Sequence, residues 1–257
     1  MSKEILSYEV DDAVGVVTID RPPVNALRYQ DLEALTDLLD SLPREDERVI
    51  ALTTGGDRTF SAGHDVTEFR EYDPDAASYR DEVYMNLLET VYDHPLPIVV
   101  GVDGPAVGAA AIIASLCDLR VASAGASFAI PEITVGIVGG YGPLRRLLPD
   151  GVARHMLYTG NPLPADRAYD LGMVSELVED PRERAVNLAT NIASKSPDAV
   201  NAARAVVREC QPAEPIEEYR LERDHIAELR QVPNTQEAAA AFLEDRDPEF
   251  GPAEYEP

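Results

Sequence analysis

The chain has 257 residues, 45% of them hydrophobic, which is enough for a sizeable core and fits one α/β unit with an appendage. Its 47 Asp and Glu outnumber its 22 Lys and Arg, so the formal net charge is −25. Such a surface has no basic stripe to neutralise phosphates and repels anionic lipids, which argues against nucleic acid and membranes as partners.

The first half of the chain alternates strand and helix patterns. A hairpin is predicted for Ser7–Val10 and the β-branched run Val14–Ile19, with a turn at Asp11–Asp12 between them. Leucines at helical spacing predict a helix over Asp31–Leu42. Strands that alternate with helices favour an α/β fold. Apolar runs bounded by Gly, Pro or charge predict strands buried on both faces at Val49–Thr54, Ile98–Val102 and Leu119–Ala122.

The second half is richer in helices. Before that half begins, Glu68–Tyr84 is acidic and aromatic and shows no clear hydrophobic period. We predict that it forms a loop or helix beside the site. Beyond Pro181, Pro and Asn separate successive helical patterns. We therefore divide the chain into a core at 1–195 and a C-terminal helical region at 196–257. The predicted helices are Arg182–Ser194, Asp198–Glu209, Ile216–Gln231 and Thr235–Leu243.

Two segments of small residues point to chemistry. Phe60–Asp65 and Gly104–Ala110 each end in small residues before a predicted helix start, where unpaired amide donors and the positive end of the peptide dipole gather. Two such starts that face each other would hold a negative oxygen. The alternative is that these small residues only allow close packing of helix on strand.

A carboxylate in an apolar setting would complete a mechanism. Glu132 lies in sequence among Phe128, Ile130, Ile133 and Val135, and burial there would raise its pKa and suit it to proton transfer near neutral pH. Fixed amides can stabilise a negative oxygen that forms when such a group removes a proton. The alternative for Glu132 is a charge that only stabilises a helix N-terminus.

Six motifs, in register over essentially the whole chain, resemble the enoyl-CoA hydratase/isomerase (crotonase) superfamily. They are Asn25–Leu27, Phe60–Asp65, Gly104–Ala110, Cys117–Asp118, Pro131–Ile133 and Ala241–Arg246. The resemblance implies a spiral of ββα units with a C-terminal helical region that trimerises. It also implies a homotrimer or hexamer that acts on acyl-CoA thioesters, with coenzyme A present only as part of the substrate.

The resemblance also implies residue roles. The backbone N–H groups of His64 and Ala109 would hold the thioester oxygen, and Glu132 would transfer the proton. The Ala62 carbonyl corresponds to the group that recognises adenine in the superfamily. Further contacts with substrate are expected from Ala26, Gly63, Asp65, Gly108, Ile112 and Tyr141.

One departure from the superfamily pattern bears on the reaction. Hydratases in the superfamily use two glutamates, and Ile112 occupies the position of the first. Isoleucine cannot activate water, whereas an isomerase needs only the Glu132 carboxylate, so hydration is in doubt. The sequence Ala62–Asp65 also resembles the superfamily's methylmalonyl-CoA decarboxylases, which makes decarboxylation an alternative. A third alternative is a non-catalytic subunit for acyl-CoA binding or assembly.

Several side chains have two interpretations. The His64 imidazole could sense a substrate carboxylate, or only its backbone N–H could matter. Asp65 is expected to orient the following turn as well. Tyr141 either points into the acyl pocket as a secondary acid or packs as an ordinary aromatic. The four histidines show no metal-ligand spacing, and the two cysteines, Cys117 and Cys210, are expected to be reduced thiols.

The charge balance also predicts the working environment. Only Lys3 and Lys195 are lysines, while Asp and Glu dominate. Molar salt shrinks the Debye length to about 3 Å and removes the self-repulsion of so acidic a surface, so a salt-rich cytoplasm is predicted. The N-terminus lacks an apolar signal core, and the longest apolar stretch, Ile98–Leu116, is broken by Asp103 and Pro105.

Overall fold

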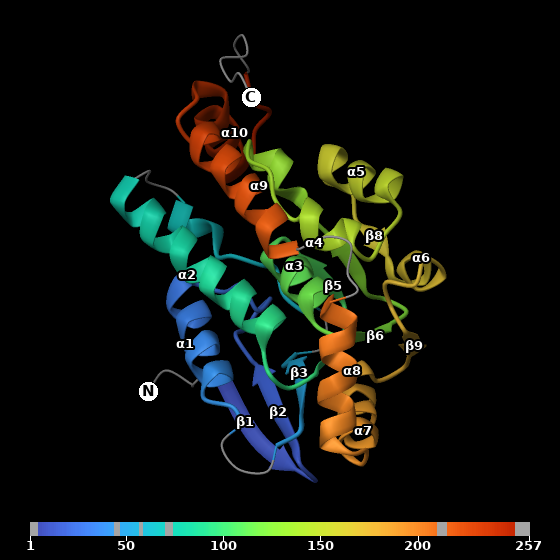
Figure 1. The fold of residues 1–257 in the computed structure, drawn as a ribbon. Helices are drawn as coiled ribbons and strands as arrows, with labels where there is room; N and C mark the ends of the chain where they lie inside the picture. Colours follow the sequence, from blue (N-terminus) through green and yellow to red (C-terminus); the bar gives the residue numbers. More distant parts are fainter. Residues whose placement is uncertain (1–4, 44–46, 57–58, 70–73, 210–214, 250–257) are drawn as a thin grey trace.

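A six-stranded sheet forms the centre of the structure, a computed structural model that describes residues 5–43, 47–56, 59–69, 74–209 and 215–249 (Figure 1). The β1 and β2 strands are antiparallel, and every later neighbour pairs in parallel. The strand order is β1(Leu6–Asp11), β2(Val14–Ile19), β3(Val49–Thr54), β4(Ile98–Val102), β6(Leu119–Ser123) and β9(Glu176–Val178).

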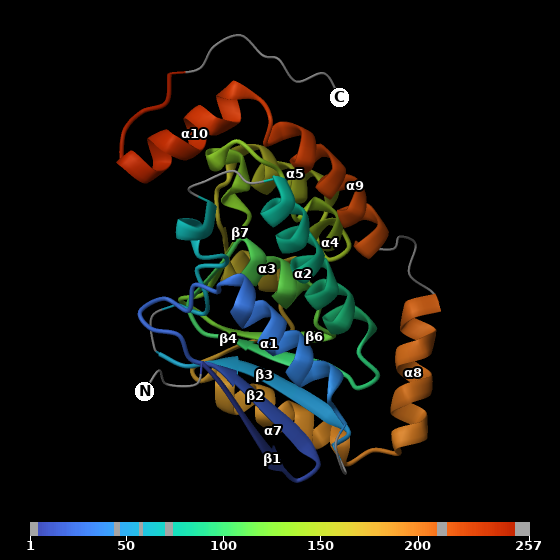
Figure 2. The ribbon, with the colours of Figure 1, turned by 90° about the vertical axis from the view of Figure 1, so that its left-hand side faces the viewer.

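Helices cover both faces of this sheet. Figure 2 shows α1(Tyr29–Asp40), α2(Pro74–Asp93) and α3(Ala109–Leu116) on one side and α7(Pro181–Ala193) on the other. The alternation of β3 explains the layering, because Ile50 and Leu52 join the core under α1 and α2 while Val49 and Ala51 pack with the alanines of α7. At Gly101 of β4, a Cβ would clash with the Pro181 carbonyl, so glycine permits the close approach of α7.

A second, three-stranded sheet lies beside the first. Its order is β5(Pro105–Val107), β7(Ser127–Ala129) and β8(Leu163–Pro164), with β5 parallel and β8 antiparallel to β7. These strands have only two or three residues, and short helical segments surround them. The segments are the 3-10 turns η1(Val66–Phe69) and η2(Pro131–Val135) and the helices α4(Tyr141–Arg145), α5(Asp150–Thr159) and α6(Ala165–Asp170).

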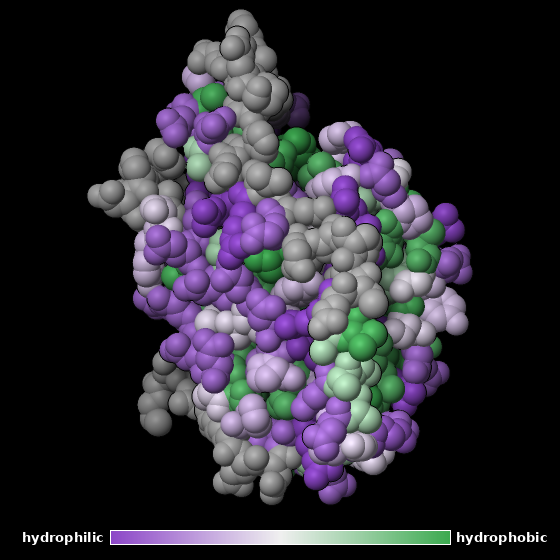
Figure 3. All heavy atoms as spheres, in the orientation of Figure 1, coloured by the Kyte–Doolittle hydropathy of each residue, from purple (hydrophilic) through white to green (hydrophobic). Residues whose placement is uncertain are grey.

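The C-terminal helices serve different parts of the molecule. α9(Pro215–Leu229) packs on α2 and α4, and α10(Pro233–Glu244) packs on η2. α8(Pro197–Glu209) stands to one side of the body in Figure 2. An apolar strip over α8 interrupts the mainly hydrophilic surface in Figure 3, where Val206 is 57% and Val207 is 55% exposed.

The structure confirms the α/β class as a mixed fold with two sheets, while the spiral of ββα units and the boundary at 195/196 stay predictions. The predicted hairpin is confirmed, but its turn is wrong by one residue: Asp12 and Ala13 take positive φ angles of 44° and 65°. These angles suit the primed turn that joins twisted strands. Glu68–Tyr84, predicted to be a loop or helix, covers the end of η1 and the first half of the long helix α2, and its residues 70–73 lie outside the described residues.

Other sequence predictions can be checked only in part. Cys117 is a free, buried thiol whose pKa is raised to about 12 by burial, and Cys210 lies outside the described residues. Within the described ranges, no helix combines the length and apolar character needed to cross a bilayer. In the same ranges, no group of three or more His, Cys, Asp or Glu side chains is placed to hold a metal ion.

Candidate active site

Three local backbone pairings bring distant segments of the chain together. Leu27 forms a parallel bridge with His64, and Ser61 forms another with Ala106 of β5. β5 in turn pairs with β7, so that Ala106 lies opposite Phe128. Because Ala109 comes just after β5 and Glu132 just after β7, these pairings place both residues at one end of the small sheet.

Asn25 fixes the segment that leads to His64. This buried residue has a positive φ of 51°, which asparagine tolerates better than most residues. Its Nδ2 donates to the carbonyls of Gly55 at 2.9 Å and Phe60 at 3.0 Å. Ser61 Oγ donates to the Asn25 carbonyl at 2.6 Å and accepts from Gly63 N at 3.1 Å.

Two backbone amides meet beside Gly63. In the Leu27–His64 bridge, the bonds to Leu27 are made by the Gly63 carbonyl and the Asp65 N–H, so the His64 N–H points to the opposite side of the segment. Gly63 has a φ of 80°, and a Cβ there would clash with the Val107 carbonyl and lie 3.2 Å from Ala109 N. Ala109 is the first residue of α3, where N–H groups have no intrahelical acceptor. The arrangement gives a pair of donors suited to a negative oxygen.

The segment after His64 differs from the sequence prediction. A helix start was expected after Phe60–Asp65, but the chain enters only the four-residue 3-10 turn η1. The Asp65 carboxylate holds this turn by accepting from Thr67 N at 3.1 Å and Thr67 Oγ1 at 2.7 Å. The second predicted start, at Ala109, is confirmed.

The Glu132 carboxyl lies next to these amides. Its Oε1 would lie 2.9 Å from a Cβ at Gly108, so any side chain at this position would have to displace the carboxyl. Gly108 also has a positive φ of 56°. Its Oε2 is shielded from solvent and has no hydrogen-bond partner among the described residues, although the residue as a whole is partly exposed. Burial, with a smaller contribution from the charge of Glu222, raises the pKa of Glu132 to about 8.

The surroundings of Glu132 differ from those expected. Ile133 is 39% exposed, so this apolar neighbour in sequence does not shield the carboxyl from solvent. Aromatic residues from other elements do: Tyr84 of α2 and Tyr219 of α9 are buried with their rings 5.8 Å apart. Burial raises the pKa of both phenols well above the ordinary value, and the charge of Glu132 acts in the same direction.

The His64 imidazole is part of the same aromatic cluster. Its ring centroid lies 4.6 Å from that of Tyr84 and 5.2 Å from that of Tyr29. Burial, and then the nearby charge of Arg230, lowers the pKa of His64 to about 4. The imidazole is therefore neutral at neutral pH.

A cleft runs between these elements. Its wall includes Ala109, Glu132 and the aromatic cluster, together with charged and apolar side chains from α2 and α9. The lining residues are Tyr29, His64, Asp81, Tyr84, Met85, Ala109, Glu132, Ile137, Val138, Tyr219, Arg223, Ile226 and Arg230.

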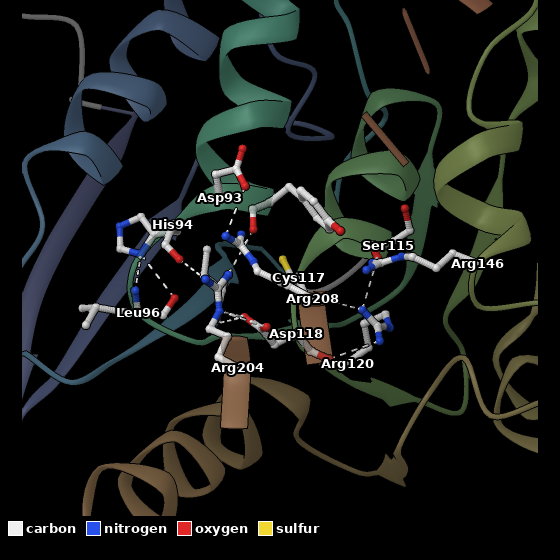
Figure 4. A network of polar contacts seen from close by, with 12 residues as sticks. Asp93, His94, Leu96, Ser115, Cys117, Asp118, Arg120, Arg146, Arg204 and Arg208 are labelled. Atoms are coloured by element: carbon white, nitrogen blue, oxygen red, sulfur yellow. Dashed lines mark hydrogen bonds and ion pairs between the residues drawn. The ribbon is translucent and has the colours of Figure 1, made fainter. Parts of the chain in front are cut away.

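Arginines hold the far end of α3, the helix that begins at Ala109. Arg120 donates to the Cys117 carbonyl at 2.5 Å and to the Ala114 carbonyl at 3.2 Å, and Arg146 donates to the Ser115 carbonyl at 2.7 Å (Figure 4). Cations at a helix C-terminus satisfy its last carbonyls and oppose the negative end of its dipole. The amide of Ala109 is thus carried by a helix that is fixed at both ends.

The same network ties α8 to the core. Arg204 of α8 pairs with Asp118 at 3.1 Å and donates to the Tyr92 carbonyl at 3.1 Å, and Asp118 also accepts from Ile98 N at 2.8 Å. Arg208 pairs with Asp93 at 3.1 Å (Figure 4). Cys117–Asp118, one of the six motifs, therefore lies at a structural junction and not in the cleft.

Other predicted site residues lie at different distances from the cleft. Ala26 and Ala62 flank the Leu27–His64 bridge, and Ala62 N donates to the Val24 carbonyl at 2.9 Å. Asp65 pairs with Arg28 at 3.2 Å, which together with the Thr67 bonds lowers its pKa to about 2.

Ile112 and Tyr141 are not among the residues that line the cleft. Ile112 is buried against Gly140, whose Cβ would lie 2.9 Å from it. The Tyr141 hydroxyl donates to Asp150, a pairing that faces the surface beside Arg154. The backbone N–H of Tyr141 donates to Glu222 at 3.1 Å.

Known proteins resemble this chain over most of its length. A family model described as Enoyl-CoA hydratase/isomerase matches residues 9–253. A probable enoyl-CoA hydratase of Bacillus subtilis (strain 168) is 31% identical over 256 residues, covering 95% of this chain and 98% of its own. A 2,3-dehydroadipyl-CoA hydratase of Escherichia coli (strain K12) is 31% identical over 256 residues, covering 97% and 99%. The crystal structure of an enoyl-CoA hydratase/isomerase from Pseudoalteromonas atlantica T6c gives a TM-score of 0.85 at 29% identity, covering 96% of this chain and all of that one.

Proposed function

Because the chain belongs to the enoyl-CoA hydratase/isomerase family, we propose that it binds acyl-CoA thioesters and moves a proton on the carbon chain beside the thioester carbonyl. Migration of the double bond is the reaction that the site geometry supports best. The observation that carries this proposal is the Glu132 carboxyl, whose Oε1 lies beside Gly108 and thus next to the amide that begins α3.

The proposed steps use three groups of this chain. The Glu132 carboxylate removes a proton from the substrate, and the electrons of that C–H bond move into the thioester to form an enolate. The N–H groups of His64 and Ala109 donate to the enolate oxygen, each worth roughly 2.7–4 kcal/mol in comparable sites. Glu132 then returns the proton to a different carbon, which shifts the double bond without any other reagent.

Hydration is the second candidate, and it is favoured by the two relatives described as hydratases. It needs one group to activate water and another to deliver a proton to carbon. Ile112, buried against Gly140, can do neither, which supports isomerisation over hydration. Ala26, Ala62, Gly63 and Asp65 remain proposed substrate contacts.

A panel of thioesters in molar KCl tests the reaction. Crotonyl-CoA, a 3-enoyl-CoA and methylmalonyl-CoA would each be incubated with the protein and followed by mass spectrometry and ultraviolet absorbance. Isomerisation changes the absorbance at constant mass, hydration adds one water, and decarboxylation removes one CO₂. Either mass change would overturn isomerisation, and binding without turnover of any substrate would identify a non-catalytic acyl-CoA-binding subunit.

We further propose a homotrimer or hexamer in a salt-rich cytoplasm. The exposed apolar side chains of Val206 and Val207 on α8 and of Phe242 and Leu243 on α10 support self-association through the C-terminal region. Sedimentation equilibrium in molar KCl should give three or six times the mass of the chain. A monomer at micromolar concentration would contradict the proposal.

A further inference from the structure

One face of α9 continues into the cleft beyond Tyr219. Tyr219, Arg223, Ile226 and the following residue Arg230 all line the cleft, and their spacing of four, three and four residues is that of one helical face. The Tyr219 hydroxyl would lie 3.4 Å from a Cβ at Gly139, and that Cβ would lie 3.9 Å from Glu132 Cγ. Arg223 follows one turn farther along this face, roughly 6 Å along the helix axis.

Most ionisable groups that line the cleft are either uncharged or already paired, so they do not present a free charge to a ligand. His64 is neutral because burial lowers its pKa to about 4, and Glu132 is largely protonated at neutral pH. Arg230 is paired with Asp81 at 2.9 Å, and the Arg230 side chain is only 17% exposed.

Arg223 is different. The side chain is partly buried, lines the cleft, and has no hydrogen bond or ion pair with any described residue. Asp81 is the other acid that lines the cleft, and Arg230 already occupies it. A partly desolvated guanidinium without an acceptor among the described residues favours an anionic ligand, and its fork of donors matches a carboxylate.

We propose that Arg223 binds a carboxylate on the acyl group of the substrate, so that the protein prefers acyl-CoA thioesters with a second acid group over those with a plain alkyl chain. This assignment rests on the proposed function, because it takes the thioester to lie between Glu132 and the two amides. Tyr219 lies on the same face of α9 as Arg223 and next to Glu132, so it would then contact the middle of the acyl chain.

Binding of unreactive thioesters tests the assignment separately from turnover. Isothermal titration in molar KCl would compare hexanoyl-CoA, adipoyl-CoA and free CoA, because the first two differ only in the terminal group of a saturated six-carbon acyl chain. We expect the wild type to bind adipoyl-CoA at least about tenfold more tightly than hexanoyl-CoA, as for a hydrogen bond to a charged group. Arg223→Gln should remove this preference, and Arg223→Lys should keep part of it.

Arg220→Gln is the matched control. It removes the same charge from the same helix, but Arg220 pairs with Glu89 and Glu217 and does not line the cleft, so the preference should persist. Equal affinity of the wild type for both thioesters would overturn the assignment. So would an equal loss of affinity for all three ligands in Arg223→Gln, because Arg223 would then bind a CoA phosphate. A preserved preference without any turnover would support the anion site and overturn the proposed reaction instead.

Discussion

At the scale of single residues, Glu132 has both the position and the protonation behaviour of a proton-transfer group. Replacing it with glutamine keeps its size and removes its acid–base chemistry. We expect Glu132→Gln to lower kcat by at least about 10²-fold, the lower range of what general acid–base catalysis contributes. Affinity for a saturated acyl-CoA should change little, because the two amides remain in place.

Steady-state turnover and calorimetric titration of the same preparation would check this. The exposed Glu228 of α9 offers the control Glu228→Gln, which should behave like the wild type. Turnover of Glu132→Gln within a few-fold of that control would remove this carboxyl from the mechanism.

The raised pKa of Glu132 predicts a pH dependence. If its carboxylate removes the proton, activity needs the ionised form, which is the minority below a pKa of about 8. The value of kcat/KM should therefore rise about tenfold per pH unit below that pKa and level off above it. The charge of Glu222 raises the Glu132 pKa, so Glu222→Gln should move the rise in kcat/KM to lower pH. A pH profile without this rise would contradict the role of Glu132 as a base.

The sequence could predict His64, Ala109 and Glu132 because each lies within a short motif. It could not predict the tyrosines around them, since Tyr29, Tyr84 and Tyr219 come from three helices that meet only in the folded chain. Arg223 was missed for the same reason. Nothing local indicates that α9 packs on α2 and lines the cleft with it, so the face of α9 that carries Arg223 shows only an ordinary helical pattern.

At the scale of elements, the donor pair depends on how closely the segment at Gly63 approaches β5 and α3. A Cβ at this position would clash with the Val107 carbonyl, a backbone group that cannot swing aside. We expect Gly63→Ala to separate His64 from Ala109 and to lower kcat by about 10²-fold or more, the cost of one lost oxyanion donor.

Gly56 provides a matched control for the backbone strain of this substitution. It has the same φ of 80°, but a Cβ there meets no described atom within 4 Å. Both variants should lose about 1–2 kcal/mol of stability from the left-handed backbone, with a further loss in Gly63→Ala from the clash. Only Gly63→Ala should lose activity when both are assayed well below their thermal transitions. Equal activity in the two variants would mean that the close approach at Gly63 does not set the donor geometry.

Element prediction succeeded where the apolar pattern was long. Val49–Thr54 and Ile98–Val102 were predicted with correct bounds because strands buried on both faces are continuous apolar runs. The strands β5, β7 and β8 have two or three residues, too few to show a period. The sequence did not decide whether the region of α2 is a loop or a helix. One side of α2 packs on α1 and α3 while another lines the cleft with Asp81 and Tyr84, and this obscures a simple amphipathic pattern.

At the scale of the whole molecule, the excess of acid is not neutralised by ion pairs. Most pairs use arginine, as in Arg184 with Glu176 at 2.7 Å and Arg246 with Glu237 at 2.5 Å. With 47 acidic and 22 basic residues, pairing every cation would still leave a net charge of −25. Salt weakens the surface pairs, but exposed pairs contribute little to stability, whereas the repulsion acts among all the excess carboxylates.

Stability should therefore rise with salt. Lowering the salt from molar KCl to ~10 mM lengthens the Debye length from about 3 Å to about 30 Å, so carboxylates across the whole surface repel one another. We expect the thermal transition to fall by roughly 10 °C or more, equivalent to a few kcal/mol at about 2–4 °C per kcal/mol for a chain of this size. Circular dichroism across a KCl series would measure the transition, and NaCl at equal ionic strength is expected to give the same result. An unchanged transition after dialysis to low salt would show that repulsion among the surface carboxylates does not limit the stability of this fold.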